Sequence, residues 1–274
     1  MSTTTQILIG AFGSVVATVV VLLTRVTFYK VRDLFPARAL FQGIVGSEKA
    51  CLVFVLRMTD KERKGTFLAP VPKYAVASSQ AGFEGRQLVP WVTSTSETQA
   101  VAHLLNVLGR AGRTEDIRLA YVGLEFDTWD APMFIVGGSW KATRAFETCD
   151  PYFRFQDDRF IMAPTGDSYQ PQSPDEDLGL MHKMVNPSTG LPVWVAMGWR
   201  GAGTIAASYA LARWWKEFGL LFGRKRFAIL VGMNDRDGWQ QLRIRRIHPE
   251  PIWTAKLLHP LAWRTLRRAL SQAG

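Results

Sequence analysis

An apolar run without a charged residue lies close to the start of the chain. It covers Ile7–Thr24 and ends at Arg25. With Val26–Tyr29 added, it reaches the roughly 20 residues that a helix needs to cross the hydrocarbon core of a bilayer. A cleaved signal peptide, the main alternative, would have a basic start, a shorter apolar core and a small-residue cleavage site. Because Met1–Gln6 carry no basic side chain, the pattern favours an uncleaved transmembrane helix.

Shorter apolar runs, separated by turn residues, follow along the rest of the chain. Those that predict strands or hairpin arms are Cys51–Leu56, Ile117–Val122, Met133–Val136, Tyr152–Phe155, Arg159–Met162, Leu180–Val185, Val193–Met197, Phe227–Val231 and Leu242–Ile247. Helices are predicted from Ser94, from the Gly137-Gly138 turn to about Thr148, and from about Ile205 to Phe218. Because strands alternate with helices, we expect a Rossmann-like, three-layer α/β sandwich with a mostly parallel sheet, preceded by one transmembrane helix.

These patterns divide the chain into four predicted parts. Residues 1–30 are a short tail and the transmembrane anchor, 31–49 a juxtamembrane connector, 50–250 the Rossmann-like domain, and 251–274 a basic, amphipathic C-terminal segment. In the last part Pro260 limits any helix to about Leu261 onward. Its apolar residues, which alternate with basic ones, are Leu257, Leu258, Leu261, Trp263, Leu266 and Leu270. We expect this segment to lie on an anionic membrane surface rather than on nucleic acid.

Charge gives the anchor a direction. The basic residues around the apolar run, Arg25, Lys30, Arg32 and Arg38, all follow it, and positively charged flanks stay in the cytoplasm. The N-terminus is therefore expected outside and the domain in the cytoplasm. The formal net charge of +10 and the pI of about 9.9 indicate anionic partners, which include lipid headgroups, phosphorylated ligands and, less favoured, nucleic acid. Small residues four apart, such as Gly10 and Ser14, predict self-association of the membrane helix.

Two cysteines, Cys51 and Cys149, limit the redox and metal chemistry of the chain. They form no CxxC pair and no Cys/His cluster with metal-ligand spacing. We interpret them as buried, reduced thiols, which fits a reducing compartment, and we expect no metal site.

The strongest local signal for a binding site is Gly198–Thr204, where a strand runs into a helix. Gly198, Gly201 and Gly203 let backbone amides face outward beside the positive end of the helix dipole, which suits a phosphate or carboxylate. Arg200 adds a guanidinium and Thr204 a hydroxyl. The spacing matches neither the dinucleotide fingerprint nor the Walker pattern, so a turn that merely packs tightly is the alternative.

A second glycine turn, Gly137-Gly138-Ser139, follows another predicted strand. In a parallel sheet both turns lie at the carboxyl ends of strands, where ligands usually bind. We therefore expect the two turns to form one site for a small anionic ligand; the cofactor is unknown, with a nucleotide as the first candidate.

Residues with acid–base or stacking chemistry are present but form no recognisable catalytic set. Asp177 and His182 are the candidates for proton transfer, with a charged surface loop as the alternative reading of Asp175–Asp177. Four tryptophans near the Gly198 turn predict core packing more than a platform for a base: Trp194, Trp199, Trp214 and Trp215. The catalytic residues stay unknown, and binding is favoured over catalysis.

Four short motifs occur in a recognisable order. They are Gly137-Gly138, Asp177-Leu178-Gly179, Asn186-Pro187 and Gly203-Thr204. Together they resemble a recurrent, poorly characterised Rossmann-like domain of bacterial proteins that occurs joined to other modules. The resemblance covers roughly Cys51 to Ile247 and implies the fold more than a function.

The sequence thus favours a membrane-anchored sensor or effector whose Rossmann-like domain binds a nucleotide-like or other anionic ligand. Bacterial stress or defence signalling is the role expected by analogy with small anchored effectors. Two alternatives remain: an anchored enzyme that acts on a nucleotide or nucleotide-sugar, and a scaffold subunit of a membrane complex.

Overall fold

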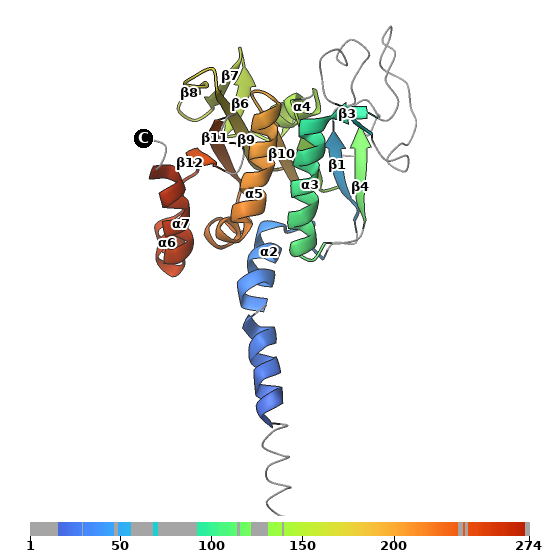
Figure 1. The fold of residues 1–274 in the computed structure, drawn as a ribbon, viewed down its shortest axis with the longest axis vertical. Helices are drawn as coiled ribbons and strands as arrows, with labels where there is room; N and C mark the ends of the chain where they lie inside the picture. The colour runs from blue at the N-terminus through green and yellow to red at the C-terminus, as the bar shows by residue number, and fades with distance from the viewer. Residues whose placement is uncertain are drawn as a thin grey trace, which may run out of the picture.

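The structure is a computed structural model of the chain. It describes residues 16–28, 30–46, 49–55, 68–70, 92–113, 116–121, 131–138, 140–234, 238 and 241–271. Within these ranges the chain forms a mixed α/β domain from which an N-terminal helix projects (Figure 1).

A seven-stranded sheet in the order β12-β11-β9-β10-β5-β1-β4 forms the centre of the domain. Its strands are β1 (Cys51–Val55), β4 (Ile117–Tyr121), β5 (Met133–Val136), β9 (Glu176–Val185), β10 (Pro192–Gly198), β11 (Phe227–Asn234) and β12 (Arg243–His248). Strands β4, β1, β5 and β10 pair in parallel, β9 is antiparallel to both β10 and β11, and β12 is antiparallel to β11. Five of the seven strands therefore point the same way, which confirms the mostly parallel sheet.

The reversal of β9 follows from the short length of its connection to β10. Strand β9 reaches β10 through the short turn at Asn186–Leu191, where the Asn186 backbone amide donates to the Leu191 carbonyl over 2.9 Å. A connection of this length joins only antiparallel neighbours, because a parallel pair needs a crossover of a dozen or more residues.

Apolar side chains cover both faces of the sheet. On one face the core includes residues of α2 (Phe35–Leu40), α3 (Thr95–Arg110), α5 (Gly201–Leu221) and α7 (Pro260–Ser271). On the other it includes residues of α4 (Trp140–Thr148) and of a small sheet made of β6 (Phe153–Gln156), β7 (Arg159–Met162) and β8 (Ser168–Tyr169). The remaining elements are η1 (Lys30–Leu34), the pair β2 (Leu68–Pro70) and β3 (Val92–Ser94), and α6 (Trp253–Leu258).

Side-chain alternation along β10 explains this three-layer packing. Trp194 and Ala196 belong to the first core, whereas Val193 and Val195 belong to the second. Successive residues of a strand point to opposite faces, so an unbroken apolar run requires cover on both sides of the sheet.

Helix α5 lies directly on the backbone of the sheet. A Cβ atom added at Gly203 would collide with the Leu178 carbonyl, and one added at Gly179 would collide with the Gly203 carbonyl. Only glycine permits this approach, because no flexible side chain could move aside. The start of α5 is thereby fixed on β9 at the edge where the parallel strands end.

Gly203→Ala should destabilise the chain strongly, whereas Gly109→Ala should not. The added methyl at residue 203 meets backbone, and forced overpacking of this kind costs on the order of 1–3 kcal/mol or more. Gly109 lies on the exposed side of α3 with no atom within 4 Å of an added Cβ, so alanine there should stabilise by about 0.5–1 kcal/mol. Urea unfolding of the two variants measures both effects; equal midpoints would contradict the close packing.

The N-terminal helix continues the chain away from the domain. Residues 16–28 are helical and project from the domain (Figure 1), and their large apolar side chains are exposed. Within the described residues, no helix is both long and apolar enough to cross a membrane. The first part of the predicted anchor, Ile7–Val15, lies outside the described residues, as do Gly10 and Ser14 of the predicted self-association face.

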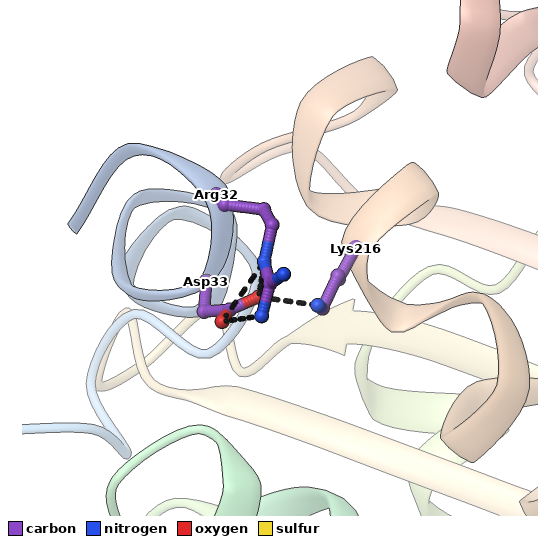
Figure 2. Close-up of polar contacts among 3 residues, drawn as sticks. All are labelled: Arg32, Asp33 and Lys216. Carbon is purple, nitrogen blue, oxygen red and sulfur yellow. Dashed lines mark hydrogen bonds and ion pairs between the residues drawn. The ribbon is translucent and has the colours of Figure 1, made fainter. Parts of the chain in front are cut away.

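A buried carboxylate attaches the connector to α5. The Asp33 side chain pairs with Lys216 of α5 and, over 2.9 Å, with Nη2 of Arg32 (Figure 2). The hydrogen bond from Arg32 is the main cause that holds the pKa of Asp33 below its ordinary value. One turn further along α5, a Cβ at Gly219 would collide with the Pro36 carbonyl. Helix α2 therefore packs against the far end of α5.

Lys183 joins the same helix ends to the sheet. This residue of β9 is 2% exposed, and its Nζ donates to the carbonyl of Leu40 over 2.7 Å and to that of Gly223 over 3.0 Å. These carbonyls belong to the carboxyl ends of α2 and α5, where a positive charge is favourable. Burial nevertheless lowers the pKa of Lys183 from 10.5 to about 7.

Lys183→Met should change how stability depends on pH. Between about 7 and 10.5 the unfolded chain carries a proton on this amine that the folded chain has lost. The free energy of unfolding of the wild type therefore rises with pH in this window, by at most about 1.4 kcal/mol per pH unit. Methionine does not titrate, so the stability of the wild type relative to the variant should grow across the window and stay level below it. Parallel pH profiles in denaturant titrations would contradict the burial of a neutral amine.

Candidate functional site

Two neighbouring parallel strands send the chain to opposite faces of the sheet. After β5 the chain enters α4 on one face, and after β10 it enters α5 on the other. Strands β5 and β10 pair directly, with Val136 opposite Ala196. Such a divergence leaves a crevice at the carboxyl edge of the sheet, where α/β proteins usually bind ligands. In Figure 1 the arrows of β1 and β4 show that this edge faces away from residues 16–28.

A cavity of about 940 Å³ occupies this crevice. Its wall combines the start of α3, the two glycine turns, α4 and β6. The lining residues are Ser94, Ser96, Glu97, Gly137, Gly138, Ala142, Phe146, Glu147, Arg154, Phe155, Gln156, Met197, Gly198, Trp199, Arg200, Gly201 and Thr204. Residues of the first turns of α3 and α5 line the cavity, and α4 lines it with Ala142, Phe146 and Glu147 along its length.

Most residues of the predicted site meet in this cavity. Gly137 and Gly138 line it from one side, and Gly198, Arg200, Gly201 and Thr204 line it from the other. Gly203 is placed differently, because it packs against the Leu178 backbone. Ser139 lies outside the described residues. The two turns are thus brought together, and ligand binding by them remains a prediction.

Asp177 holds the amides at the start of α5. Its fully buried carboxylate accepts hydrogen bonds from the backbone N–H groups of Leu178 (2.8 Å), Arg200 (3.0 Å) and Gly203 (2.6 Å). Burial raises the pKa of this carboxyl group, although the amides and Arg200 oppose the shift. A ligand therefore finds the amides of Arg200 and Gly203 already engaged by a protein carboxylate.

The Arg200 side chain is also engaged. Its Nη2 donates to the backbone carbonyls of Pro174 over 2.9 Å and Glu176 over 2.7 Å. The guanidinium thereby fixes the chain that precedes β9 to the Gly198–Thr204 turn. In this arrangement Arg200 forms part of the cavity rim. To bind a ligand through its guanidinium, as predicted, Arg200 would first have to break these two hydrogen bonds.

Other polar groups of the cavity come from elements distant in the sequence. Ser94 accepts from the Glu97 amide over 3.2 Å, which caps the start of α3, and its hydroxyl lies 3.1 Å from that of Ser96. A Cβ at Gly201 would lie 2.6 Å from the Ser96 hydroxyl, so these two residues form one wall. The Glu97 carboxylate lies over Gly137, whose φ of +86° favours glycine.

The hairpin strand β6 adds the residues that sequence reasoning missed. Arg154, Phe155 and Gln156 line the cavity, and the Phe155 ring contacts that of Trp199 edge-on at 5.8 Å between centroids. No local motif marks them, since only the fold of the hairpin over the glycine turns brings them to the site. The alternation of aromatic and polar residues along β6 is the one sequence signal that Arg154 and Gln156 lie on the face opposite to the core.

Two candidates for proton transfer lie away from the cavity. Asp177 binds the start of α5, and His182 is completely buried, with Nε2 accepting from the Tyr152 amide over 3.2 Å. Burial lowers the pKa of His182 to about 3. The hypothesis that this pair performs acid–base catalysis is therefore not supported; the carboxylates that line the cavity are Glu97 and Glu147.

The tryptophans and cysteines are buried, as predicted, with the exception of Trp199. Trp194, Trp214 and Trp215 are buried in the core, whereas Trp199 lines the cavity. Cys51 and Cys149 are free and buried, and burial raises the pKa of their thiols to about 12 and about 11. Neither is a reactive nucleophile in the folded chain.

Comparison with known proteins gives no independent assignment of this site. No protein-family model matches the sequence, and no curated protein matches it either. Within the described ranges, no group of three or more His, Cys, Asp or Glu side chains has the arrangement to hold a metal ion. The chemistry of the cavity therefore has to be argued from its own residues.

Asp177→Asn tests the role of the buried carboxylate. In asparagine, an NH2 group would replace one of the two carboxylate oxygens, so one backbone N–H, such as that of Gly203, would face a donor instead of an acceptor. An unsatisfied buried donor costs about 1–3 kcal/mol. The same change at the exposed Asp167 should alter stability by no more than about 0.5 kcal/mol. Urea unfolding measures both variants, and a neutral effect of Asp177→Asn would contradict the hydrogen-bond network.

Proposed function

We propose that the chain is a membrane-tethered sensor or effector whose Rossmann-like domain binds an anionic, nucleotide-sized ligand between the two glycine turns. The supporting observation is the cavity of about 940 Å³ where β5 and β10 diverge, lined by both predicted turns. Its volume falls within the roughly 300–1,000 Å³ of ordinary ligand sites.

The lining chemistry favours a ligand with a charged end and a planar end. The Ser94 and Ser96 hydroxyls and the Arg154 guanidinium provide hydrogen-bond donors, and the starts of α3 and α5 in the wall add positive potential. Phe146, Phe155 and Trp199 provide aromatic surface against which a base can stack. Glu97 and Glu147 accept hydrogen bonds from ligand hydroxyls or amines. Their negative charges disfavour ligands that are negatively charged along their whole length.

The tether rests on the composition of Ile7–Thr24 and on the exposed apolar side chains of residues 16–28. Under this proposal the N-terminus lies outside and the cavity faces the cytoplasm, at the end of the domain turned away from the membrane. A soluble cytoplasmic ligand, rather than a lipid, would then reach it.

Helix α5 offers a mechanical route from the cavity to the tether. It begins at Gly201 in the cavity wall and ends at Leu221, beside the connector. Its backbone is non-helical at Trp214 (φ −118°, ψ 17°), so α5 consists of two helical segments joined at a kink. In the connector, Asp33 pairs with Lys216 of α5, and Pro36 packs against Gly219. Lys183 also bridges the carbonyls of Leu40 and Gly223, beyond the end of α5. A ligand that shifts Gly201 against Ser96 would therefore move the connector.

The alternative of an anchored enzyme has one observation in its favour. Glu97 and Glu147 are carboxylates in the cavity wall, and one of them could transfer a proton to or from a bound substrate. A turnover assay with the same ligand panel separates the two hypotheses, because a sensor returns its ligand unchanged.

Ligand-induced thermal stabilisation tests the proposed site. The detergent-solubilised full chain is titrated with ATP, GTP, NAD, a uridine diphosphate sugar and inorganic phosphate. A true ligand at 100 times its Kd should stabilise the wild type by about 2.7 kcal/mol. Gly201→Val, which pushes Ser96 into the cavity, and Arg154→Ala should abolish this gain.

Gly109→Val is the matched control, since it adds the same side chain on an open face of α3. It should leave the basal melting temperature unchanged or slightly higher, because valine is a better helix former than glycine, and it should keep the ligand-induced gain. If Gly201→Val and Arg154→Ala both respond to the ligand like the wild type, the ligand binds elsewhere. The absence of stabilisation by any ligand in the panel would favour the scaffold alternative.

A further inference from the structure

Exposed apolar side chains are concentrated in two stretches of the chain. Among the described residues, every exposed Val, Leu, Ile, Phe or Trp except Leu105 lies either within residues 16–35 or within residues 252–261. The second stretch contains Ile252, Trp253, Leu257, Leu258 and Leu261, which are 52%, 72%, 57%, 75% and 75% exposed. We call this stretch, where α6 turns into α7, the α6–α7 corner.

The rest of α7 attaches the corner firmly to the domain. Ala262, Leu266 and Ala269 are buried against the core, and Trp263 and Leu270 pack at its border. The amphipathic stripe expected to face a membrane is thus divided: its C-terminal leucines belong to the core, and only the corner projects. An exposed cluster on a rigid base is a surface that another phase or molecule must cover.

The position of the corner indicates what covers it. Figure 1 places α6 and the start of α7 at the end of the domain from which residues 16–28 project, opposite the cavity edge. Helix α2 lies at this same end of the domain, and its first residue, Phe35, is 61% exposed. The corner, α2 and the projecting helix therefore lie at the same end of the molecule.

Charge around the corner favours an anionic surface. Residues 251–271 contain Lys256, Arg264, Arg267 and Arg268 and no acidic residue. The nearest acid in sequence, Glu250, pairs with Lys256 over 3.0 Å, and Lys256 also lies over the Trp263 ring at 4.4 Å. A tryptophan and leucines flanked by basic side chains match the interface of an anionic leaflet, where indole rings and cations are both stabilised.

From these observations we infer that the α6–α7 corner is a second membrane contact, which inserts Trp253, Leu257, Leu258 and Leu261 among the headgroups of an anionic leaflet. The inference rests on the proposed tether, which holds the base of the domain near the bilayer. Two separated contacts fix the orientation of the domain, whereas a single helix leaves it free to tilt.

Site-specific labelling of the full chain in vesicles tests the inference. The native cysteines are buried, so a thiol label reacts selectively at Leu258→Cys or at the matched site Gln170→Cys. Gln170 is exposed beside β8, which Figure 1 places at the opposite end of the domain. The label is a fluorophore, and its quenching by brominated lipid and by aqueous iodide is measured. The vesicles are phosphatidylcholine with and without phosphatidylserine.

The label at residue 258 should be quenched several-fold more by brominated lipid than the label at residue 170, and more strongly when phosphatidylserine is present. Adding Leu257→Ser and Leu261→Ser should remove this quenching without unfolding, because both side chains are exposed.

Vesicle flotation of the same samples separates the corner from the tether. Flotation with both labels equally open to iodide would overturn the corner contact and leave the tether standing. A label at residue 258 that is shielded from iodide but not quenched by lipid would overturn the inference in favour of a protein partner or a second copy of the chain. A chain that does not float with any vesicle would overturn the tether and the corner together.

Discussion

The carboxylate of Asp177 is the interaction on which the arrangement of this molecule depends. By accepting from the amides of Leu178, Arg200 and Gly203, it ties β9, the Gly198 turn and α5 to one point. The glycine contacts at residues 179 and 203 allow α5 to come close enough for these bonds. The orientation of α5 then determines both the cavity wall at Gly201 and the helix surface that receives the connector at Lys216 and Gly219.

This constraint also divides the glycine turn into two roles. Gly203 and Gly198 serve backbone packing, as the alternative interpretation of the turn required, whereas Gly201 lies against Ser96 in the cavity wall. The motifs that carry the resemblance to a bacterial Rossmann-like domain include the same structural contacts. Asp177 and Gly203 are hydrogen-bonded, and the Asn186 side chain accepts from the Ser188 amide within the β9–β10 turn. These residues therefore make contacts within the domain, and the resemblance itself stays a prediction.

Much of the fold could be predicted because its signals are local. The apolar runs Cys51–Leu56, Met133–Val136 and Phe227–Val231 predict strands, and β1, β5 and β11 lie there. The helix predicted from Ser94 is α3, with Ser94 as its N-cap. Strand direction was less accessible, since an apolar run has the same pattern in either orientation. Asp177 was interpreted within a charged loop because its partner amides lie 23 and 26 residues further along the chain. Arg154 and Gln156 were missed for the same reason, as only tertiary folding brings β6 over the turns.

The central claim is that the space between the two glycine turns holds an anionic small molecule, and native mass spectrometry of the detergent-extracted full chain tests it most directly. The account predicts that the wild type releases a bound species of nucleotide size on activation, and that Gly201→Val, expressed and purified in parallel, releases none. Equal occupancy in the two proteins, or a wild type that carries no small molecule and acquires none from the nucleotide panel, would contradict it.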